Sequence, residues 1–345
     1  MQLDIRKELA QNPFILAPME AVNCTSFRLL CQRRGAQFVY SDMIDADVFC
    51  EYAQTHTKAE AVAKYINPHV EERLVVQLGG RNIENLKIVM DACPFAQWFD
   101  LNVGCPLGYM LGKKGGCYLM KHPDQLYTLV TELVTHAKKL GKGFSVKIRS
   151  GWDDKSINAV EIAKGLQDIG ICLLTIHPRT RKDLYSKKAD WALARKVADA
   201  LTIPVCLSGD VTNAHSAHAA FNQTKCDAIM CGRGAKHNPS IFTELTTYYK
   251  TKQLPTKPSM LYCKTAQNAI TDFFEWFALY SQIEQRFSVS EILDHARWTI
   301  RGAKNASILQ EKLIAQFPKE EQAQYETNRE VLHTKLQLIL SEIQF

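Results

Sequence analysis

Short apolar runs recur along the first two thirds of the chain, each followed by a polar or glycine-rich loop and then by a segment with helical periodicity. Eight such runs are visible in the 345 residues. They are nearly continuous in apolar residues rather than alternating, which is typical of parallel strands buried on both faces. The runs cover residues 14–19, 38–43, 74–78, 98–103, 144–148, 173–177, 204–208 and 228–231.

The segments between the runs predict helices with recognisable ends. Thr25 or Ser26 can cap the first helix and Asn82 the second, while Pro123-Asp124 opens a longer one. Eight strand–helix repeats within about 235 residues match the number and size of a (β/α)8 barrel. A doubly wound sheet is the alternative, but the even spacing favours a closed TIM barrel, which we assign to residues 1–249.

The pattern changes after Tyr249. Residues 250–258 are polar and contain two prolines, as expected of a linker. From residue 259 to residue 345 only helical patterns follow, at 262–283, 290–304, 306–316 and 319–343. We therefore predict that a small all-helical bundle is appended to the barrel as a second domain.

Composition narrows the class of protein. No run approaches the roughly 18 apolar residues of a membrane span, and residues 1–11 lack the apolar core of a secretory signal. No two of the eleven cysteines are spaced C-x-x-C, which argues against a metal site and a disulfide framework. We expect a cytoplasmic monomer with reduced thiols and with no membrane, metal or protein partner. The net charge of +6 permits a polyanionic partner without requiring one.

Polar residues gather where the predicted strands end, which is where barrel enzymes carry their chemistry. Ser208-Gly209-Asp210 and Gly232-Arg233-Gly234 place backbone amides and an arginine where barrels bind phosphate. Gln77 can donate to and accept from the edge of a heterocycle, and Lys147 offers a cation. This combination indicates FMN, although a phosphosugar isomerase would also fit these residues.

The strand-end motifs, taken in order, resemble the tRNA-dihydrouridine synthase family in its bacterial form. They are A-P-M-E, V-Q-L-G-G, L-N-V-G-C-P, V-K-I-R-S-G-W, I-H-P-R-T, S-G-D and C-G-R-G. Each motif is weak alone, but the ordered set is specific, and the helical tail is similar to that family's tRNA-binding domain. The resemblance implies a flavin-dependent oxidoreductase that uses FMN and NADPH, or NADH, to reduce a D-loop uridine of tRNA to 5,6-dihydrouridine.

The resemblance also implies roles for individual residues. Cys105 would be the proton donor, while Asn102, Tyr185 and Arg179 would contact the tRNA. Tyr185, followed by Asp190-Trp191, is similar to the branch that acts on position 16, whereas the R-S-G-W turn resembles the position-17 branch; we favour position 16 slightly. The residues that would bind FMN are Pro18, Met19, Glu20, Gln77, Lys147, His177, Ser208, Gly209, Asp210, Gly232 and Arg233.

The spacing of Asn102 and Cys105 then has a chemical explanation. Reducing the C5–C6 bond of uracil requires a hydride at C6 and a proton at C5. A thiol with the usual pKa of about 8.5 is protonated at neutral pH and can act as the acid. The Asn102 amide can hydrogen-bond the uracil edge with both of its groups.

Basic residues in the predicted bundle are a candidate tRNA contact. Arg297, Arg301 and Lys304 recur at spacings of four and three, which places them on one face of the helix predicted for 290–304. The alternative is a solvated face whose cations pair with Asp294.

Two other functions stay open on the sequence alone. A flavin-dependent dihydroorotate or dihydropyrimidine dehydrogenase also places an Asn and a catalytic Cys or Ser beside FMN, but it does not need a helical C-terminal bundle. An RNA-binding protein that uses the barrel only as a scaffold does not need Gln77, Lys147, His177 and Cys105 together.

Overall fold

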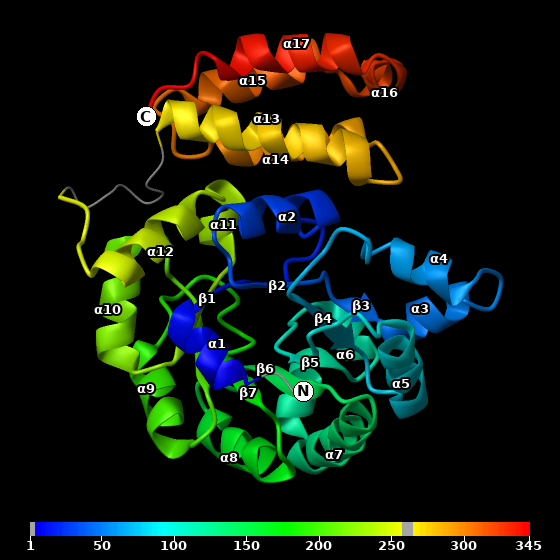
Figure 1. Cartoon of the computed structure of the whole chain (residues 1–345), viewed down its shortest axis with the longest axis vertical. Helices are drawn as coiled ribbons and strands as arrows, with labels where there is room; N and C mark the ends of the chain where they lie inside the picture. Colours follow the sequence, from blue (N-terminus) through cyan, green and yellow to red (C-terminus); the bar gives the residue numbers. More distant parts are fainter. Residues whose placement is uncertain (1–3, 257–264) are drawn as a thin grey trace.

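The computed structural model describes residues 4–256 and 265–345. Its strands form one sheet in which every strand pairing is parallel. The sheet closes because β1 (Phe14–Leu16) pairs with β2 (Phe38–Tyr40) on one side and with β9 (Ala228–Cys231) on the other. The ring is completed by β4 (Leu74–Gly79), β5 (Trp98–Val103), β6 (Gly143–Arg149), β7 (Leu173–His177) and β8 (Val205–Ser208). The predicted TIM barrel is confirmed, and the doubly wound sheet is excluded (Figure 1).

A further two-residue strand, β3 (Ile44–Asp45), pairs with the end of β4. The apolar run predicted as one strand over 38–43 therefore stops early, at the end of β2. Asp42 explains the break, because its carboxylate accepts the Met43 N–H at 2.8 Å and the Ala21 N–H at 3.1 Å. These bonds turn the chain out of the sheet and tie it to the loop after β1.

Helices alternate with the strands and form the outer layer of the barrel (Figure 1). This part of the chain contains α1 (Ile5–Gln11), α2 (Thr25–Arg33), α3 (Ala46–Tyr52), α4 (Lys58–Ala63), α5 (Ile83–Ala92), α6 (Gly108–Gly112), the 3-10 helix η1 (Gly116–Lys121), α7 (Pro123–Lys139), α8 (Ala159–Ile169), α9 (Trp191–Ala200), α10 (Ala214–Thr224), α11 (Arg233–His237) and α12 (Ile241–Thr251). Asn82 caps α5 and Pro123 opens α7, as predicted. Cys24, rather than Thr25 or Ser26, precedes α2, and its side chain makes no capping bond.

Alternate residues of each strand point to opposite sides of the barrel wall. Inside, Phe38, Tyr40 and Trp98 belong to an apolar cluster that also contains Ile5 and Leu9 of α1. Helix α1 therefore closes the end of the barrel where the strands begin, and in Figure 1 it lies between the labels of β1 and β7. The inward-facing polar residues lie at the opposite end, where the strands finish.

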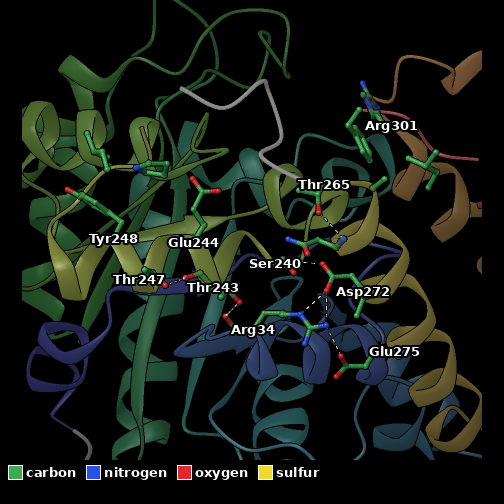
Figure 2. A pocket seen from close by; sticks show the side chains of 18 of the residues that line it. Arg34, Ser240, Thr243, Glu244, Thr247, Tyr248, Thr265, Asp272, Glu275 and Arg301 are labelled. Atoms are coloured by element: carbon green, nitrogen blue, oxygen red, sulfur yellow. Dashed lines mark hydrogen bonds and ion pairs between the residues drawn. The ribbon is translucent and has the colours of Figure 1, made fainter. Parts of the chain in front are cut away.

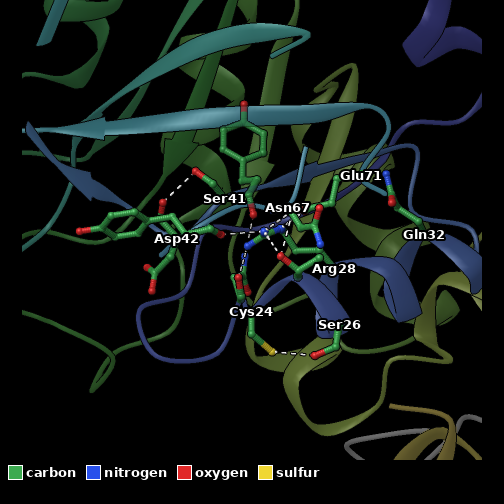
Figure 3. A network of polar contacts seen from close by, with 12 residues as sticks. Cys24, Ser26, Arg28, Gln32, Ser41, Asp42, Asn67 and Glu71 are labelled. Atoms are coloured by element: carbon green, nitrogen blue, oxygen red, sulfur yellow. Dashed lines mark hydrogen bonds and ion pairs between the residues drawn. The ribbon is translucent and has the colours of Figure 1, made fainter. Parts of the chain in front are cut away.

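A buried ion pair joins α2 to the segment that leads into β4. Arg28 and Glu71 have fully buried side chains, and Glu71 also accepts from Thr25 Oγ1 at 3.0 Å and from the Asn67 N–H at 2.9 Å (Figure 3). Arg28 donates to the carbonyl oxygen of Asn23. The Asn23 amide in turn donates to carbonyl oxygens at the ends of β1 and β2, at 2.7 and 2.9 Å. The network thus anchors the loop after β1, which carries three of the predicted cofactor residues, Pro18, Met19 and Glu20.

The chain after the barrel is helical, as predicted. It contains α13 (Ala266–Ile283), α14 (Val289–Ile300), α15 (Ala306–Gln316), the 3-10 helix η2 (Lys319–Glu321), α16 (Gln322–Thr327) and α17 (Arg329–Leu340). Helix α13 packs on α2, where Arg34 donates to Asp272 at 2.7 Å and to Glu275 at 2.6 Å. The predicted linker 250–258 and the start of the helix predicted for 262–283 lie partly outside the described residues, so the domain boundary stays a prediction. Among the helices that the structure describes, none is long and apolar enough to span a membrane.

Two predicted helices in this part have the wrong bounds. The helix predicted for 290–304 ends at Ile300, and Gly302 follows with a left-handed φ of 87°. The helix predicted for 319–343 is divided into three elements, with a break at Asn328, whose side chain accepts a bond from Val331 N–H. A glycine in the left-handed conformation ends a helix, and an asparagine cap starts one. A search for apolar periodicity detects neither signal.

Candidate active site

A cavity of about 830 Å³ opens at the carboxyl ends of the strands, within the roughly 300–1,000 Å³ typical of small-molecule sites. Every predicted cofactor residue except Glu20 and Gln77 lines it. Those residues are Pro18, Met19, Lys147, His177, Ser208, Gly209, Asp210, Gly232 and Arg233. Arg179 and Tyr185, which were predicted to contact the tRNA, line it as well.

A buried guanidinium organises one wall of the cavity. The Arg179 side chain is 3% exposed and donates to both carboxylate oxygens of Asp210, at 2.6 and 2.7 Å. It also donates to His177 Nε2 at 3.0 Å and to the Lys187 carbonyl oxygen at 2.7 Å. Burial opposes ionisation of Asp210, but the bonds from Arg179 and from the Ala189 N–H lower its pKa. Arg179 therefore lies inside the wall, and this position does not favour its predicted contact with tRNA.

His177 is held neutral in this wall. Burial, followed by the positive charges of Lys147 and the neighbouring arginines, lowers the pKa of His177 well below its usual value. Because Arg179 donates to Nε2, the ring proton is assigned to Nδ1. His177 thus offers a neutral N–H donor.

Lys147 lines the cavity from β6, in register with Asn102 of β5 and Thr175 of β7. Burial, followed by repulsion from Arg149, lowers the pKa of Lys147 to about 8. Its amine has no hydrogen-bond or ion-pair partner within residues 4–256 and 265–345. Partial burial of an amine without a partner is unfavourable, and a ligand atom that accepts a hydrogen bond or carries negative charge would relieve it.

Cys105 lies in the loop after β5 and is partly buried. Asn102 Oδ1 holds this loop by accepting the N–H groups of Gly104 at 3.0 Å and of Cys105 at 2.7 Å. The Cys117 N–H donates to the Cys105 carbonyl oxygen at 3.0 Å. Gly116 passes so close that an added Cβ would lie 2.6 Å from that oxygen. Burial raises the pKa of the Cys105 thiol, so the thiol keeps its proton at neutral pH.

Gln77 lies beneath this loop and not on the cavity surface. It is fully buried, donates to Asp100 Oδ2 at 2.8 Å and accepts from Asn102 Nδ2 at 2.9 Å. Because the side chain is fully buried, its predicted contact with a flavin ring would require the residues that cover it to move. Asn102 has one N–H left for a substrate, because its oxygen already accepts two bonds from the Cys105 loop.

Glu20 is exposed at the mouth of the barrel, and its carboxylate accepts a bond from Tyr109 Oη at 3.2 Å. After burial, the charge of Glu20 is the next cause that raises the pKa of the Cys105 thiol. An electrostatic role toward Cys105 therefore fits Glu20 better than its predicted contact with a cofactor.

Two further residues complete the mouth. Arg149 is 2% exposed and donates to the Gly104 carbonyl oxygen at 2.9 Å and to two carbonyl oxygens in the loop after β7. The loops after β5 and β7 are thus joined through one side chain. Tyr185 is 56% exposed, and the guanidinium of Arg233 lies 4.7 Å from its ring centroid. Tyr185 offers a flat aromatic surface at the entrance.

The sequence matches the family model described as Dihydrouridine synthase (Dus) over residues 15–337. The chain belongs to the dihydrouridine synthase family. A probable tRNA-dihydrouridine synthase of Rickettsia conorii is 32% identical over 302 residues, which cover 87% of each chain. The tRNA-dihydrouridine synthase B of Pectobacterium carotovorum is 32% identical over 70% of this chain and 74% of its own. The predicted family, and with it the assignment as an oxidoreductase, is confirmed.

The C-terminal cations of this dihydrouridine synthase family member do not share one helix face. Arg297 lies on α14 and pairs with Asp294 at 2.7 Å, the alternative raised by the sequence. Arg301 and Lys304 lie beyond the end of α14, and both are exposed. The prediction of one common face was wrong because the helix ends at Ile300.

Arg301 and Lys304 instead border a groove of about 2000 Å³ between α12 and the C-terminal helices (Figure 2). Figure 2 shows Arg301 and the α12 residue Glu244 on opposite sides of it. Asp272 and Glu275 also line the groove, so both cations and carboxylates border it. A role of Arg301 and Lys304 in binding tRNA stays a prediction.

The sequence interpretation missed Asp100 as part of the site. Asp100 and Asn102 are two residues apart in a strand and therefore point to the same side of the wall. The same spacing relates Lys147 to Arg149, whose side chain turns inward rather than toward solvent. Period-two spacing back from Asn102 was the signal that would have found Asp100.

Proposed function

We propose that this protein is an FMN-dependent, NADPH-driven tRNA-dihydrouridine synthase that reduces the C5–C6 bond of one D-loop uridine. The observation that carries the proposal is the register of β5 and β6, which puts Asn102 beside Lys147. This pairing joins the Cys105 loop to the cavity, so an acid and a cofactor-sized space adjoin each other. Relatives named tRNA-dihydrouridine synthase supply the substrate class.

The residues around the cavity fit a flavin mononucleotide. The unpartnered amine of Lys147 suits the electron-rich edge of an isoalloxazine ring, and the neutral N–H of His177 suits a ring carbonyl. Arg233, 47% exposed at the rim, suits a phosphate. The chemistry that FMN supplies when bound is hydride transfer, with NADPH or NADH as the source of electrons.

Cys105 acts as the general acid. Its loop is fixed by Asn102 and Gly116, and burial keeps the thiol protonated. The Sγ proton goes to C5 of the uracil, and the thiolate regains a proton from solvent before the next cycle. A positioned acid of this kind contributes about 10²–10⁴-fold to a rate.

The tRNA meets the chain at the mouth of the barrel. Asn102 donates its free N–H to an acceptor on the base, and Tyr185 stacks on the base or its neighbour. Extruding the uridine costs roughly a few kcal/mol, which contacts from Arg301, Lys304 and Arg297 offset. We further propose that the enzyme works as a cytoplasmic monomer.

The test is to incubate the purified protein with NADPH and unmodified tRNA and to map dihydrouridine by mass spectrometry. A gain of two hydrogens at one D-loop uridine is expected. Position 16 is favoured by Tyr185 and position 17 by the R-S-G-W turn, and the map distinguishes them. NADPH oxidation without any change in tRNA would refute the proposal and indicate a free pyrimidine as the substrate.

A further inference from the structure

A line of buried polar side chains crosses β4, β5 and β6 beneath the Cys105 loop. At one end, Trp98 Nε1 donates to Ser145 Oγ at 3.0 Å, and Ser145 donates to Asp100 Oδ1 at 2.5 Å. Gln77 Nε2 donates to the other carboxylate oxygen at 2.8 Å. None of these four side chains belongs to a residue more than 1% exposed, so bulk water does not compete for their bonds.

The line continues upward to the loop through Asn102. Gln77 Oε1 accepts from Asn102 Nδ2 at 2.9 Å. Asn102 Oδ1 then accepts the N–H groups of Gly104 and Cys105. From the loop down to Asp100, every bond is therefore donated in the same direction.

Asp100 determines that direction at the buried end of the line, and the loop N–H groups, which can only donate, favour it at the other end. A side-chain amide has an oxygen and an NH2 group of similar size, so packing alone does not decide which way Gln77 or Asn102 points. A carboxylate can only accept. Asp100 therefore requires the NH2 of Gln77, which leaves Gln77 Oε1 for the NH2 of Asn102 and Asn102 Oδ1 for the loop.

We propose that Asp100 is a positioning residue that fixes the orientation of the Gln77 and Asn102 amides and thereby holds the backbone of the Cys105 loop. The importance of that loop for catalysis rests on the proposed function. The orientation of the amides does not, because it follows from the hydrogen bonds alone.

An asparagine at position 100 would not do the same. Its amide could present either its oxygen or its NH2 to Gln77. The orientation of the Gln77 amide would then determine the orientation of the Asn102 amide. In the second orientation Asn102 would turn its NH2 toward the N–H groups of Gly104 and Cys105, and the loop would lose its acceptor. Desolvation of a carboxylate is unfavourable, and burial raises the pKa of Asp100 to about 6. The group nevertheless stays ionised at neutral pH, as a fixed acceptor must.

The same line determines what Asn102 offers to the base. Its oxygen is used twice by the loop, and one hydrogen of its NH2 is used by Gln77. Only one N–H remains, so the substrate atom it meets must be an acceptor. The carbonyl oxygens of uracil meet that requirement.

Amide hydrogen exchange of the protein with its native cofactor content tests the proposal directly. We expect Asp100→Asn to speed exchange at Gly104 and Cys105, resolved to single residues by fragmentation, by tenfold or more. The Cys105 thiol should also react several-fold faster with iodoacetamide in this variant, as measured on its peptide. Exchange and alkylation rates equal to those of the wild type would overturn the proposal.

Ser145→Ala is the matched control. It removes one hydrogen bond from the same carboxylate but leaves the bond between Asp100 and Gln77, which sets the direction. Exchange at the two loop amides should stay within about twofold of wild type. If Ser145→Ala loosens the loop as much as Asp100→Asn does, general destabilisation is the cause and the proposal fails. Should Asp100→Asn not fold, Gln77→Leu cuts the line at the next bond and must give the same loosening.

Kinetics separate the positioning role from the proposed function. Asp100→Asn should lower kcat for tRNA reduction about tenfold and leave KM for NADPH unchanged. If the wild type reduces no tRNA, the proposed function fails, whereas the exchange and alkylation results still decide the role of Asp100.

Discussion

The cations at the mouth of the barrel and those of the C-terminal helices have opposite surroundings. Arg149 and Arg179 are 2% and 3% exposed and donate to backbone carbonyl oxygens, a histidine and a carboxylate. Arg301 and Lys304 are exposed and have no ion pair within the described parts of the chain. The first group builds the site, whereas the second is free to meet a partner.

This difference shows which residues a sequence motif can place correctly in the structure. A residue at a parallel strand end is brought to the site by the topology of the barrel, whatever its own side chain does. A cation on a surface helix has no such constraint, and its neighbours depend on where the helix ends. The two groups should therefore respond differently to substitution.

Cys105→Ala should have the largest effect. Removal of the proposed general acid is expected to slow tRNA reduction about 10²–10⁴-fold and to leave NADPH oxidation by the bound flavin intact. Mass-spectrometric counting of dihydrouridine against time measures the first rate, and absorbance at the NADPH band measures the second. Cys117→Ala, at the start of η1 and fully buried, should retain activity. Equal losses in the two variants would contradict the role of Cys105.

Arg179→Ala should destabilise the barrel by about 1–3 kcal/mol, because Asp210 keeps only the exposed Arg233 and the Ala189 N–H as partners. The flavin content of the purified Arg179→Ala variant should fall as well. Arg301→Ala removes the same charge from an exposed site and should change stability by less than about 0.5 kcal/mol. Urea unfolding of the wild type, Arg179→Ala and Arg301→Ala measures both changes in stability. Equal stability of the two variants would remove the distinction between the two groups of cations.

Lys147 should make FMN binding dependent on pH. Its pKa near 8 means that the amine is charged below pH 8 and loses its charge above it. Affinity of the apoprotein for FMN should therefore fall as pH rises beyond 8, by at most about tenfold per unit. Lys147→Met should bind more weakly and show no such dependence. A flat profile for the wild type, measured by flavin fluorescence, would contradict a contact between Lys147 and the flavin.

Arg301→Glu should have the smallest effect. If Arg301 contacts a tRNA phosphate, affinity should fall several-fold and the slope of log affinity against log salt should decrease by about one. NADPH oxidation should be unchanged. Lys312→Glu is the control, because Lys312 already pairs with Glu342. Equal tRNA affinity of Arg301→Glu and the wild type would exclude this surface.

The strand ends were predictable because each nearly continuous apolar run is followed by a polar or glycine-rich loop. Lys147, His177, Ser208 and Arg233 were placed at one cavity from these features alone. The roles of Gln77 and Arg179 were not, because each is bonded to a residue from another strand or loop. Such pairings depend on strand register, which one sequence does not reveal.

In the C-terminal part of the chain, the presence of helices was easier to predict than their ends. Their presence was evident from apolar periodicity, but their ends were decided by single residues such as Gly302 and Asn328. An error of four residues at the end of α14 was enough to separate Arg301 from the face that carries Arg297. Surface predictions of this kind are therefore less reliable than predictions at strand ends.

The most direct test of the central claim is a single-turnover experiment. The flavin of the purified enzyme is reduced with NADPH without oxygen, excess reductant is removed, and unmodified tRNA is added. Flavin reoxidation in step with dihydrouridine formation, slowed at least a hundredfold by Cys105→Ala, is the predicted result. Flavin that stays reduced in the presence of tRNA, or that reoxidises equally fast in Cys105→Ala, would contradict it.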